Sequence, residues 1–164
     1  MTGAVTLRAA QPRDVPAIVA LVNGYAAEQV MLPRSAESVE LALDDFVVAV
    51  DARGTVVGCG ALKTYSPSLG EVASLAVARE AHGRGLGRAI VDAVEALARS
   101  RGVRELFALT LTPRFFEAAG YAVTDRVRYP EKVRRDCLAC ARRFGCAEVC
   151  VRRVLEAEVL DAAA

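Results

Sequence analysis

A glycine-rich turn follows a short apolar run and precedes a long amphipathic segment. The apolar run, residues 72–77, predicts a buried strand, and the apolar residues after the turn step by three and four as in a helix. The first N–H groups of a helix have no partner within the helix, and glycines let a phosphate approach them. We therefore expect this turn to bind a diphosphate. The residues expected to contact it are His82, Gly83, Arg84, Gly85, Leu86, Gly87 and Arg88.

The glycine spacing of this turn selects among phosphate-binding motifs. It lacks the G-x-x-x-x-G-K-[ST] pattern of nucleoside-triphosphate loops, and its G-x-G-x-G spacing does not match the dinucleotide fingerprint G-x-G-x-x-G. The strand, turn and helix resemble the coenzyme-A-binding motif of the GNAT superfamily of N-acetyltransferases, [RQ]-x-x-G-x-[GA]. The matching residues are His82, Gly85 and Gly87, and His82 replaces the usual Arg or Gln.

Acetyl transfer to an amine needs a neutral amine, a stabilised oxyanion and a protonated leaving thiolate. Glu71, at the start of the predicted strand, can accept the amine's proton, and the alternative is a solvated carboxylate. Backbone N–H groups of Leu75, Ala76 and Val77 can bind the acetyl oxygen if the strand bulges there. Thr110 on the next strand can donate to the leaving sulfur, or be a core threonine.

Three residues are candidates for binding the acceptor. Arg34 follows a proline in a predicted loop, and a guanidinium binds a carboxylate through two parallel hydrogen bonds. Lys132 is the second candidate for a carboxylate, and Ser74 can orient the substrate through its backbone or hydroxyl. The alternatives are a solvated loop arginine and an ordinary strand serine.

The elements that must position these residues follow from apolar periodicity. Together they predict a single domain over residues 1–164, with a core at about 5–154 and a frayed tail at 156–164. The fold class is α/β of the α+β type, a mixed and mostly antiparallel sheet flanked by helices. Strands are predicted at 5–8, 46–50, 55–62, 72–77, 106–111, 121–127 and 148–154, and helices at 12–30, 35–43, 86–101 and 114–119, with Ser35 as an N-cap.

The element order is similar to the GNAT fold from about residue 7 to 153. Residues 115–121, FFEAAGY, resemble that superfamily's late motif F-Y-E-x-x-G-F. Phe116 stands where a tyrosine often acts as general acid, so we assign it to coenzyme binding and expect the acid elsewhere or absent.

Several separate stretches resemble the short amino-acid N-acetyltransferases of arginine biosynthesis, which make N-acetylglutamate. This resemblance implies direct transfer from acetyl-CoA to L-glutamate in a ternary complex, with no separate amino-acid-kinase domain. The stretches are residues 31–35, 57–62, 71–77, 107–110, 130–133 and 136–140.

Composition limits the partners. The net charge of +1 gives no electrostatic argument for nucleic acid, and no apolar run reaches the roughly 18 residues of a membrane span. The N-terminus lacks the pattern of a secretion signal, which predicts a cytoplasmic protein. The sequence leaves a homodimer open.

Four of the five cysteines form a C-x2-C-x5-C-x3-C pattern: Cys137, Cys140, Cys146 and Cys150. Zinc, a local disulfide and free thiols all remain open, although Cys150 lies in an apolar strand pattern typical of a buried thiol. Rival functions are a GNAT enzyme with another amine or protein acceptor, and a non-catalytic coenzyme-A sensor or zinc-stabilised binding module.

Overall fold

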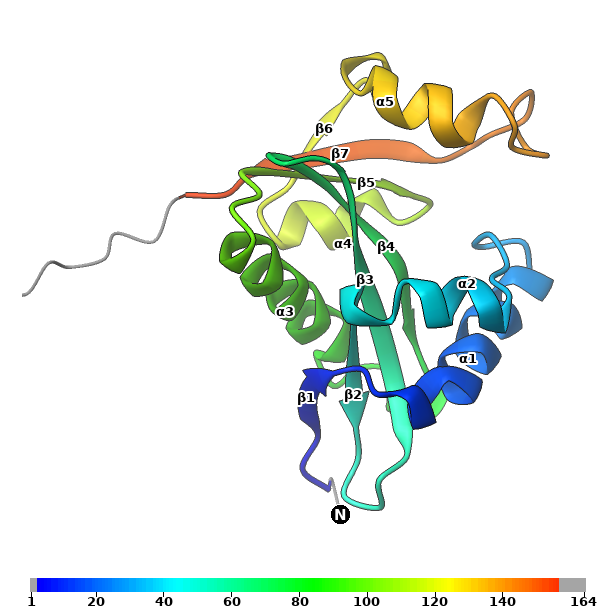
Figure 1. Cartoon of the computed structure of the whole chain (residues 1–164), viewed down its shortest axis with the longest axis vertical. Helices are drawn as coiled ribbons and strands as arrows, with labels where there is room; N and C mark the ends of the chain where they lie inside the picture. Colours follow the sequence, from blue (N-terminus) through cyan, green and yellow to red (C-terminus); the bar gives the residue numbers. More distant parts are fainter. Residues whose placement is uncertain (1–2, 157–164) are drawn as a thin grey trace, which may run out of the picture. The chain divides into compact units, whose positions relative to one another are not determined.

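The computed structural model describes residues 3–156, and the predicted frayed tail lies almost wholly outside them. The described chain divides into two compact units (Figure 1). The first comprises residues 3–63 and 72–97, and the second comprises residues 64–71 and 98–156. Both units are therefore built from separated stretches of sequence. The single-domain reading stays a prediction.

The seven strands of the described residues form one sheet, in the order β1-β2-β3-β4-β5-β7-β6. Pairing is parallel between β4 and β5 and antiparallel between β1 and β2, β2 and β3, β5 and β7, and β6 and β7. This confirms the mixed, mostly antiparallel class. The strands are β1 Thr6–Ala9, β2 Phe46–Val50, β3 Val56–Ser66, β4 Leu69–Val77, β5 Glu105–Thr110, β6 Ala122–Thr124 and β7 Val149–Val154.

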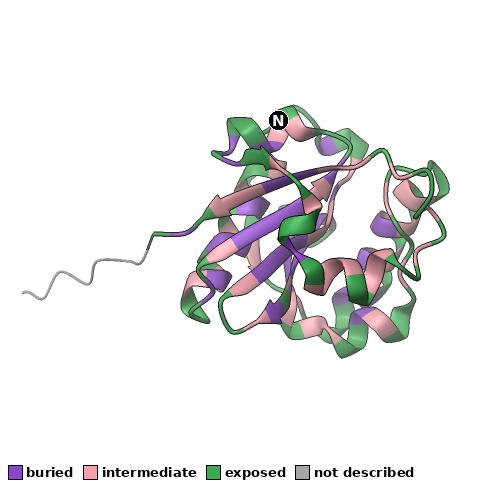
Figure 2. Cartoon of the chain, turned by 90° about the horizontal axis from the view of Figure 1, so that it is seen from above, coloured by how far each residue is buried: buried purple, intermediate pink, exposed green. Residues whose placement is uncertain are grey.

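Turns join β2, β3 and β4, helices lie between most of the other strands, and buried residues concentrate along the central strands (Figure 2). None of the helices among residues 3–156 is long and apolar enough to cross a membrane. The helices are α1 Val15–Ala27, α2 Ala36–Leu41, α3 Leu86–Ser100, α4 Pro113–Ala118 and α5 Pro130–Lys132. Short 3₁₀ turns lie at Pro12–Asp14, Leu43–Asp45, Arg79–Ala81 and Arg126–Arg128, and a π-helical turn lies at Val133–Cys137.

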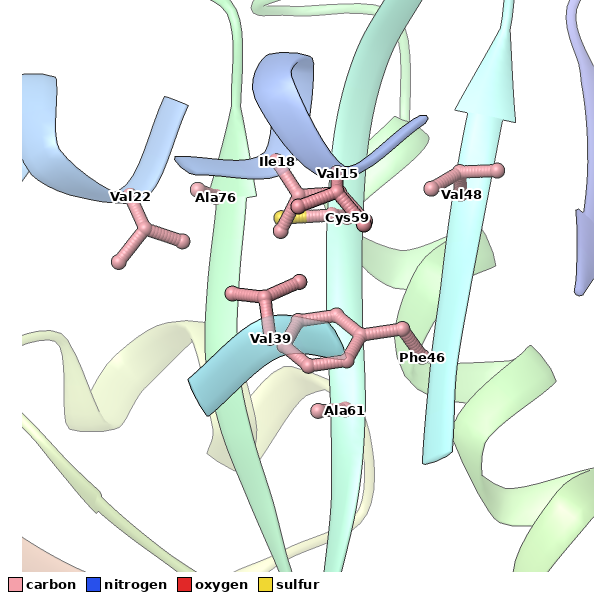
Figure 3. Close-up of a cluster of buried hydrophobic side chains, with 9 residues drawn as sticks. All are labelled: Val15, Ile18, Val22, Val39, Phe46, Val48, Cys59, Ala61 and Ala76. Atoms are coloured by element: carbon pink, nitrogen blue, oxygen red, sulfur yellow. The ribbon is translucent and has the colours of Figure 1, made fainter. Parts of the chain in front are cut away.

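In the first unit, α1 and α2 cover one face of β2, β3 and β4. Alternate residues of the strands point to this face, as the pleat requires. In the resulting core, valine and isoleucine side chains of the helices pack against strand residues that include Phe46 and Cys59 (Figure 3). Its buried members are Val15, Ile18, Val22, Val39, Phe46, Val48, Cys59, Ala61 and Ala76.

Helix α3 packs on the other face of β3 at unusually short range. A Cβ atom added at Gly58 would lie 2.7 Å from Cδ1 of Ile90, and one at Gly60 would lie 2.6 Å from its Cγ2. Side chains at these two positions would therefore force the helix away. The two glycines of β3 set the depth at which α3 is seated.

The second unit has an aromatic core. The ring of Phe107 stacks on Tyr129 with centroids 4.2 Å apart, and Tyr65 lies tilted against Phe107 at 5.6 Å. The buried Cys150 of β7 completes this cluster. Phe107 of this cluster lies opposite Glu71 in the parallel pairing of β4 with β5.

Two local predictions have clear outcomes. Ser35 is confirmed as an N-cap, because its hydroxyl accepts a hydrogen bond from the Ser38 amide. The strand predicted at 121–127 is wrong beyond Thr124: the Asp125 side chain accepts from the Val127 amide and starts a 3₁₀ turn instead.

Candidate active site

The turn before α3 presents backbone donors. Gly83 and Gly85 have φ angles of 75° and 74°, in the left-handed region that favours glycine. The Ala89 amide donates to the Gly85 carbonyl at 3.1 Å, so the amides of Leu86, Gly87 and Arg88 have no acceptor within the helix. A Cβ atom added at Gly83 or Gly85 would meet nothing within 4 Å, so the space beside these two glycines is open. This geometry fits an anionic ligand.

Two arginines add positive charge beside these donors. Arg84 donates to the Gly3 carbonyl at 3.0 Å, and Arg88 pairs with Asp92 at 3.0 Å one helical turn later. Both arginines are exposed, which leaves their guanidinium groups accessible.

His82 is bound to the end of β4. Its Nε2 lies 2.9 Å from the Val77 carbonyl oxygen and 2.9 Å from the Tyr25 hydroxyl, and Tyr25 donates to the same carbonyl. The two rings are nearly parallel, with an angle of 6° between them. His82 thus joins the turn to β4 and α1.

Strand β4 is irregular at Ser74. This residue has a φ of 51°, a conformation that costs a non-glycine residue about 1–3 kcal/mol and is often found at functional sites. The buried Cys59 thiol donates to the Ser74 carbonyl at 3.4 Å. Burial raises the pKa of Cys59 to about 12, so this thiol is no nucleophile. The irregularity directly precedes the predicted acetyl-oxygen donors at residues 75–77.

Arg34 is fixed through its backbone. The Asn23 side chain accepts from the Arg34 amide at 2.8 Å and donates to the Arg34 carbonyl at 2.9 Å. Both atoms of the Asn23 amide are thus used to hold one residue of the loop between α1 and α2.

The guanidinium of Arg34 is half-buried and has no carboxylate within ion-pair distance among the described residues. It donates to the Ser38 hydroxyl and carbonyl at 3.3 and 3.1 Å and to the Ser74 hydroxyl at 3.4 Å. Burial lowers its pKa, yet a guanidinium stays charged in proteins. Three N–H donors make these contacts, and a guanidinium has five. Donors therefore remain for an incoming anion.

Glu71 belongs to a buried polar cluster of the second unit. Its Oε2 accepts from the Tyr65 hydroxyl at 2.7 Å and from Lys132 Nζ at 3.1 Å. Lys132 also donates to Asp136 Oδ2 at 2.9 Å, and Tyr65 contacts the same oxygen at 2.7 Å. Glu71 is only 5% exposed, so the solvated-carboxylate alternative does not describe it.

Lys132 was predicted to bind a substrate carboxylate, and its ammonium contacts two protein carboxylates. Burial alone lowers the pKa of Lys132, but the two carboxylates outweigh burial and the pKa ends above its usual value. An ammonium has three N–H donors, so one is left for a further acceptor.

Thr110 and Phe116 have local partners. The buried Thr110 hydroxyl accepts from the Thr112 amide at 2.9 Å and lies 3.1 Å from the Thr112 hydroxyl. Phe116 is buried edge-on between Phe115 and Tyr121, with centroids 5.1 and 5.2 Å away. Their assignments to the leaving sulfur and to coenzyme binding stay predictions.

The five cysteines are all free thiols. No group of three or more His, Cys, Asp or Glu side chains in residues 3–156 is arranged to hold a metal ion. Cys150 is buried as its strand pattern predicted, and burial raises its pKa to about 11.

A family model describing the acetyltransferase (GNAT) family matches residues 19–121. The chain belongs to the GNAT family. It is accordingly an enzyme of the acyltransferase class, and its fold is the GNAT fold.

Several relatives of this GNAT chain are similar over most of its length. An uncharacterized N-acetyltransferase of Chlorobaculum tepidum is 40% identical over 149 residues, 91% of this chain and 96% of the relative. The amino-acid acetyltransferase of Mycobacterium tuberculosis is 38% identical over 70% of this chain and 67% of the relative.

A solved structure from a larger protein is also similar. N-acetylglutamate synthase from Neisseria gonorrhoeae, complexed with coenzyme A and N-acetyl-glutamate, superposes with a TM-score of 0.83 at 30% identity. The match covers 95% of this chain but only 36% of that one. The GNAT chain thus spans about a third of that enzyme.

Sequence reasoning missed three residues that contact predicted site residues: Tyr65 and Asp136 beside Glu71 and Lys132, and Asn23 beside Arg34. Tyr65 lies beyond the predicted strand 55–62, and β3 extends to Ser66 in the structure. Asp136 follows Lys132 by four residues, a helical spacing that would have indicated their ion pair had a helical turn been predicted there. Asn23 gave no local signal, because its partner Arg34 lies in the next loop.

Proposed function

We propose that this chain transfers the acetyl group of acetyl-CoA directly to the α-amine of L-glutamate. The observation that carries the proposal is the half-buried Arg34 guanidinium, which has N–H donors to spare and no carboxylate partner among the described residues. Asp45 acts on this guanidinium electrostatically without forming an ion pair with it, and a carboxylate of the substrate would add direct charge-assisted hydrogen bonds.

The relatives support this choice of acceptor. Enzymes named amino-acid acetyltransferase match at 34–38% identity, and a solved neighbour holds N-acetyl-glutamate with coenzyme A. Arginine biosynthesis and a cytoplasmic location belong to the same proposal. A homodimer remains compatible with it.

The coenzyme's diphosphate binds the amides at the start of α3, from Gly83 to Arg88. The amides of residues 75–77 donate to the acetyl oxygen, where charge develops in the transition state. Glu71 accepts the proton of the substrate ammonium, directly or through water. The amine nitrogen then bonds to the acetyl carbon, the carbon–sulfur bond breaks, and the thiolate takes up a proton, with Thr110 as its proposed donor.

Thiol release from acetyl-CoA, measured with each of the twenty amino acids, tests the proposal. We expect glutamate to give the highest kcat/KM. Glutamine is the informative comparison, because it replaces the side-chain carboxylate with an amide of equal size. If a different amine gave the highest kcat/KM, that amine and not glutamate would be the acceptor.

Calorimetry with coenzyme A separates the enzyme from a sensor. Turnover with an amino acid supports the transferase. Binding of coenzyme A without release for any amine or protein terminus would instead favour a non-catalytic module.

A further inference from the structure

The buried thiol of Cys59 on β3 lies beside the irregular part of β4. Its side chain is fully buried in the core that α1 and α2 form with the strands (Figure 3). The thiol donates to the Ser74 carbonyl at 3.4 Å, and its sulfur accepts a hydrogen bond from the Ala76 amide. Burial raises the pKa of this thiol to about 12, so it keeps the proton that it donates. One side chain thus holds two peptide groups of β4, one on each side of Leu75.

Ser74 is the point at which β4 leaves the regular strand conformation. Its φ of 51° contrasts with about −120° to −140° in a strand, and such a conformation persists only where the surroundings support it. Support comes from two side chains: Cys59 binds the Ser74 carbonyl, and Arg34 donates to the Ser74 hydroxyl at 3.4 Å. Loss of the thiol would therefore remove the support on the core side.

The peptide bond after Ser74 converts this contact into a direction for the Leu75 amide. Residues 3–156 contain no cis peptide bond, and in a planar trans peptide the C=O and N–H groups point in opposite directions. The Ser74 carbonyl points toward the sulfur, so the Leu75 N–H points away from it. The contact that fixes the carbonyl therefore also fixes this amide.

The amides that follow agree with this direction. The Ala78 amide donates to the Val57 carbonyl of β3 at 2.8 Å, and the Ala76 amide contacts the thiol of the same strand. Successive N–H groups of a strand point to opposite edges, so the Leu75 amide faces away from β3. In the described chain β5 pairs with β4 only over residues 69–71, so β5 does not bind this amide.

The strand that carries the thiol is held from its other face. Gly58 and Gly60 flank Cys59 and let α3 approach so closely that an added Cβ atom would lie 2.7 or 2.6 Å from Ile90. Because side chains alternate along a strand, Cys59 points to the opposite face, into the core. The thiol is thus fixed between two packed layers and is a rigid anchor for β4.

On the basis of the proposed function, in which the amides of residues 75–77 donate to the acetyl oxygen, we propose that Cys59 is a positioning residue for the Leu75 amide. The thiol holds the Ser74 peptide group in the orientation that presents this N–H to the thioester oxygen. Such donors are effective because they are fixed before charge develops in the transition state. A misplacement of about 1 Å can lower a rate about 10²-fold, so an anchor away from the reacting atoms affects catalysis.

Infrared spectra of bound acetyl-CoA, labelled with carbon-13 at the acetyl carbonyl, test the proposal without turnover. A hydrogen bond to the thioester oxygen lowers its C=O stretching frequency. We expect a lowered frequency in the wild type and a return toward that of free acetyl-CoA in Cys59→Ala, which has neither donor nor acceptor. Cys59→Ser should keep most of the wild-type shift, because a hydroxyl both donates and accepts.

Val48→Ala is the matched control. Val48 lies opposite Cys59 in the pairing of β2 with β3 and is fully buried in the same core. Its substitution opens space in that core but removes no hydrogen bond to β4, so the C=O frequency should match that of the wild type. Equal frequencies in Cys59→Ala and the wild type, or equal changes in Cys59→Ala and Val48→Ala, would overturn the proposal.

Steady-state kinetics, with whichever amine the enzyme accepts, give a second readout. Cys59→Ala should lower kcat about 10- to 100-fold and leave the KM for acetyl-CoA unchanged, because the bond to the acetyl oxygen strengthens in the transition state. Cys59→Ser should recover most of kcat. A raised KM for acetyl-CoA with an unchanged kcat would assign Cys59 to coenzyme binding and contradict the proposal.

The infrared outcomes separate this proposal from the proposed function. An unshifted frequency in the wild type would remove the acetyl-oxygen donors of the proposed function, and the role of Cys59 with them. A wild-type shift that persists in Cys59→Ala would remove only the role of Cys59. If Cys59→Ala does not fold, as judged by circular dichroism, Cys59→Val takes its place, because valine fills the space without a hydrogen-bonding group.

Discussion

Arg34 and Glu71 differ in what surrounds them, and this difference separates their proposed roles. The Arg34 guanidinium donates to hydroxyl and carbonyl groups and lies over the Phe46 ring, and it forms no ion pair among the described residues. Glu71 already has an ammonium and a phenol at its Oε2. Arg34 is therefore suited to binding an anion, whereas Glu71 is held in place by these two contacts and is the base only under the proposed function.

Arg34→Ala should raise the KM for glutamate by about 10- to 100-fold and leave the KM for acetyl-CoA unchanged. The reason is the loss of a charge-assisted hydrogen-bonded contact with a carboxylate, worth roughly 1.5–3 kcal/mol. Arg34→Lys should recover only part of this, because an ammonium cannot bind a carboxylate through a planar pair of donors.

Steady-state kinetics with each substrate varied in turn measures both constants. Arg53→Ala is the matched control, since Arg53 is an exposed arginine in the turn between β2 and β3. Equal KM values for Arg34→Ala and the wild type would remove Arg34 from the substrate site.

Glu71→Gln should lower kcat by about 10²- to 10⁴-fold, with little change in the KM for acetyl-CoA. The amide is similar in size but accepts no proton from an ammonium at neutral pH. Stopped assays of thiol release over a range of pH check this. If activity recovers fully at high pH, where the free amine predominates, the defect is in proton removal; an undiminished kcat at neutral pH excludes Glu71 as the base.

At the scale of elements, the seat of α3 on β3 depends on volume at two positions. Gly60→Ala should destabilise the protein by about 1–3 kcal/mol, because the new methyl would lie 2.6 Å from Cγ2 of Ile90 and must displace it. Urea unfolding followed by circular dichroism measures the free energy of unfolding.

Gly24→Ala provides the contrast. Gly24 lies inside α1, and an added Cβ there would meet nothing within 4 Å. Alanine favours a helix over glycine, so this variant should gain roughly 0.5–1 kcal/mol. If both glycine variants shifted stability in the same direction, close packing at Gly60 would not be the cause.

Elements were predictable where the signal was local. The Ser35 cap and the apolar run of 72–77 depend on neighbouring residues, and both appear in the structure. The end of β6 was missed because the capping side chain of Asp125 competes with the strand ladder. The Glu71 cluster was only half predicted: Tyr65 and Asp136 are 71 residues apart, and nothing in either segment marks the contact.

At the scale of the whole molecule, an ion pair near the N-terminus should make the free energy of unfolding depend on pH. Arg8 donates to both oxygens of Asp14, at 2.7 and 3.0 Å, and the Gln11 amide donates to Asp14 at 2.7 Å. The Arg8 hydrogen bonds, with the Gln11 amide, lower the pKa of Asp14 despite its burial.

A carboxyl group with a lowered folded-state pKa stabilises the fold above its unfolded pKa, near 3.9, and loses this contribution as pH falls through the folded value. Asp14→Asn should therefore cost about 2 kcal/mol at pH 7 and less at pH 3. Thermal unfolding at both pH values measures this. Glu40→Gln, at an exposed carboxylate of α2, is the control, and a pH-independent loss in Asp14→Asn would argue against the ion pair.

The order of elements along the chain was predictable, and the division into two units was not. Each unit combines residues far apart in sequence, with β3, β4 and α3 contributing to both. Periodicity reports which face of an element is buried, but not against which distant segment it is buried. Long-range placement is therefore the part of this fold that sequence alone left open.

The side chain of Asn23 has a consequence for affinity. Its amide holds both main-chain groups of Arg34, so the entropy lost in ordering that loop is lost during folding and not when a ligand binds. Under the proposed function, the strength of glutamate binding then depends on a residue that glutamate never touches. Variants of this protein that bind glutamate more weakly or more tightly should accordingly be sought at Asn23 as well as at Arg34.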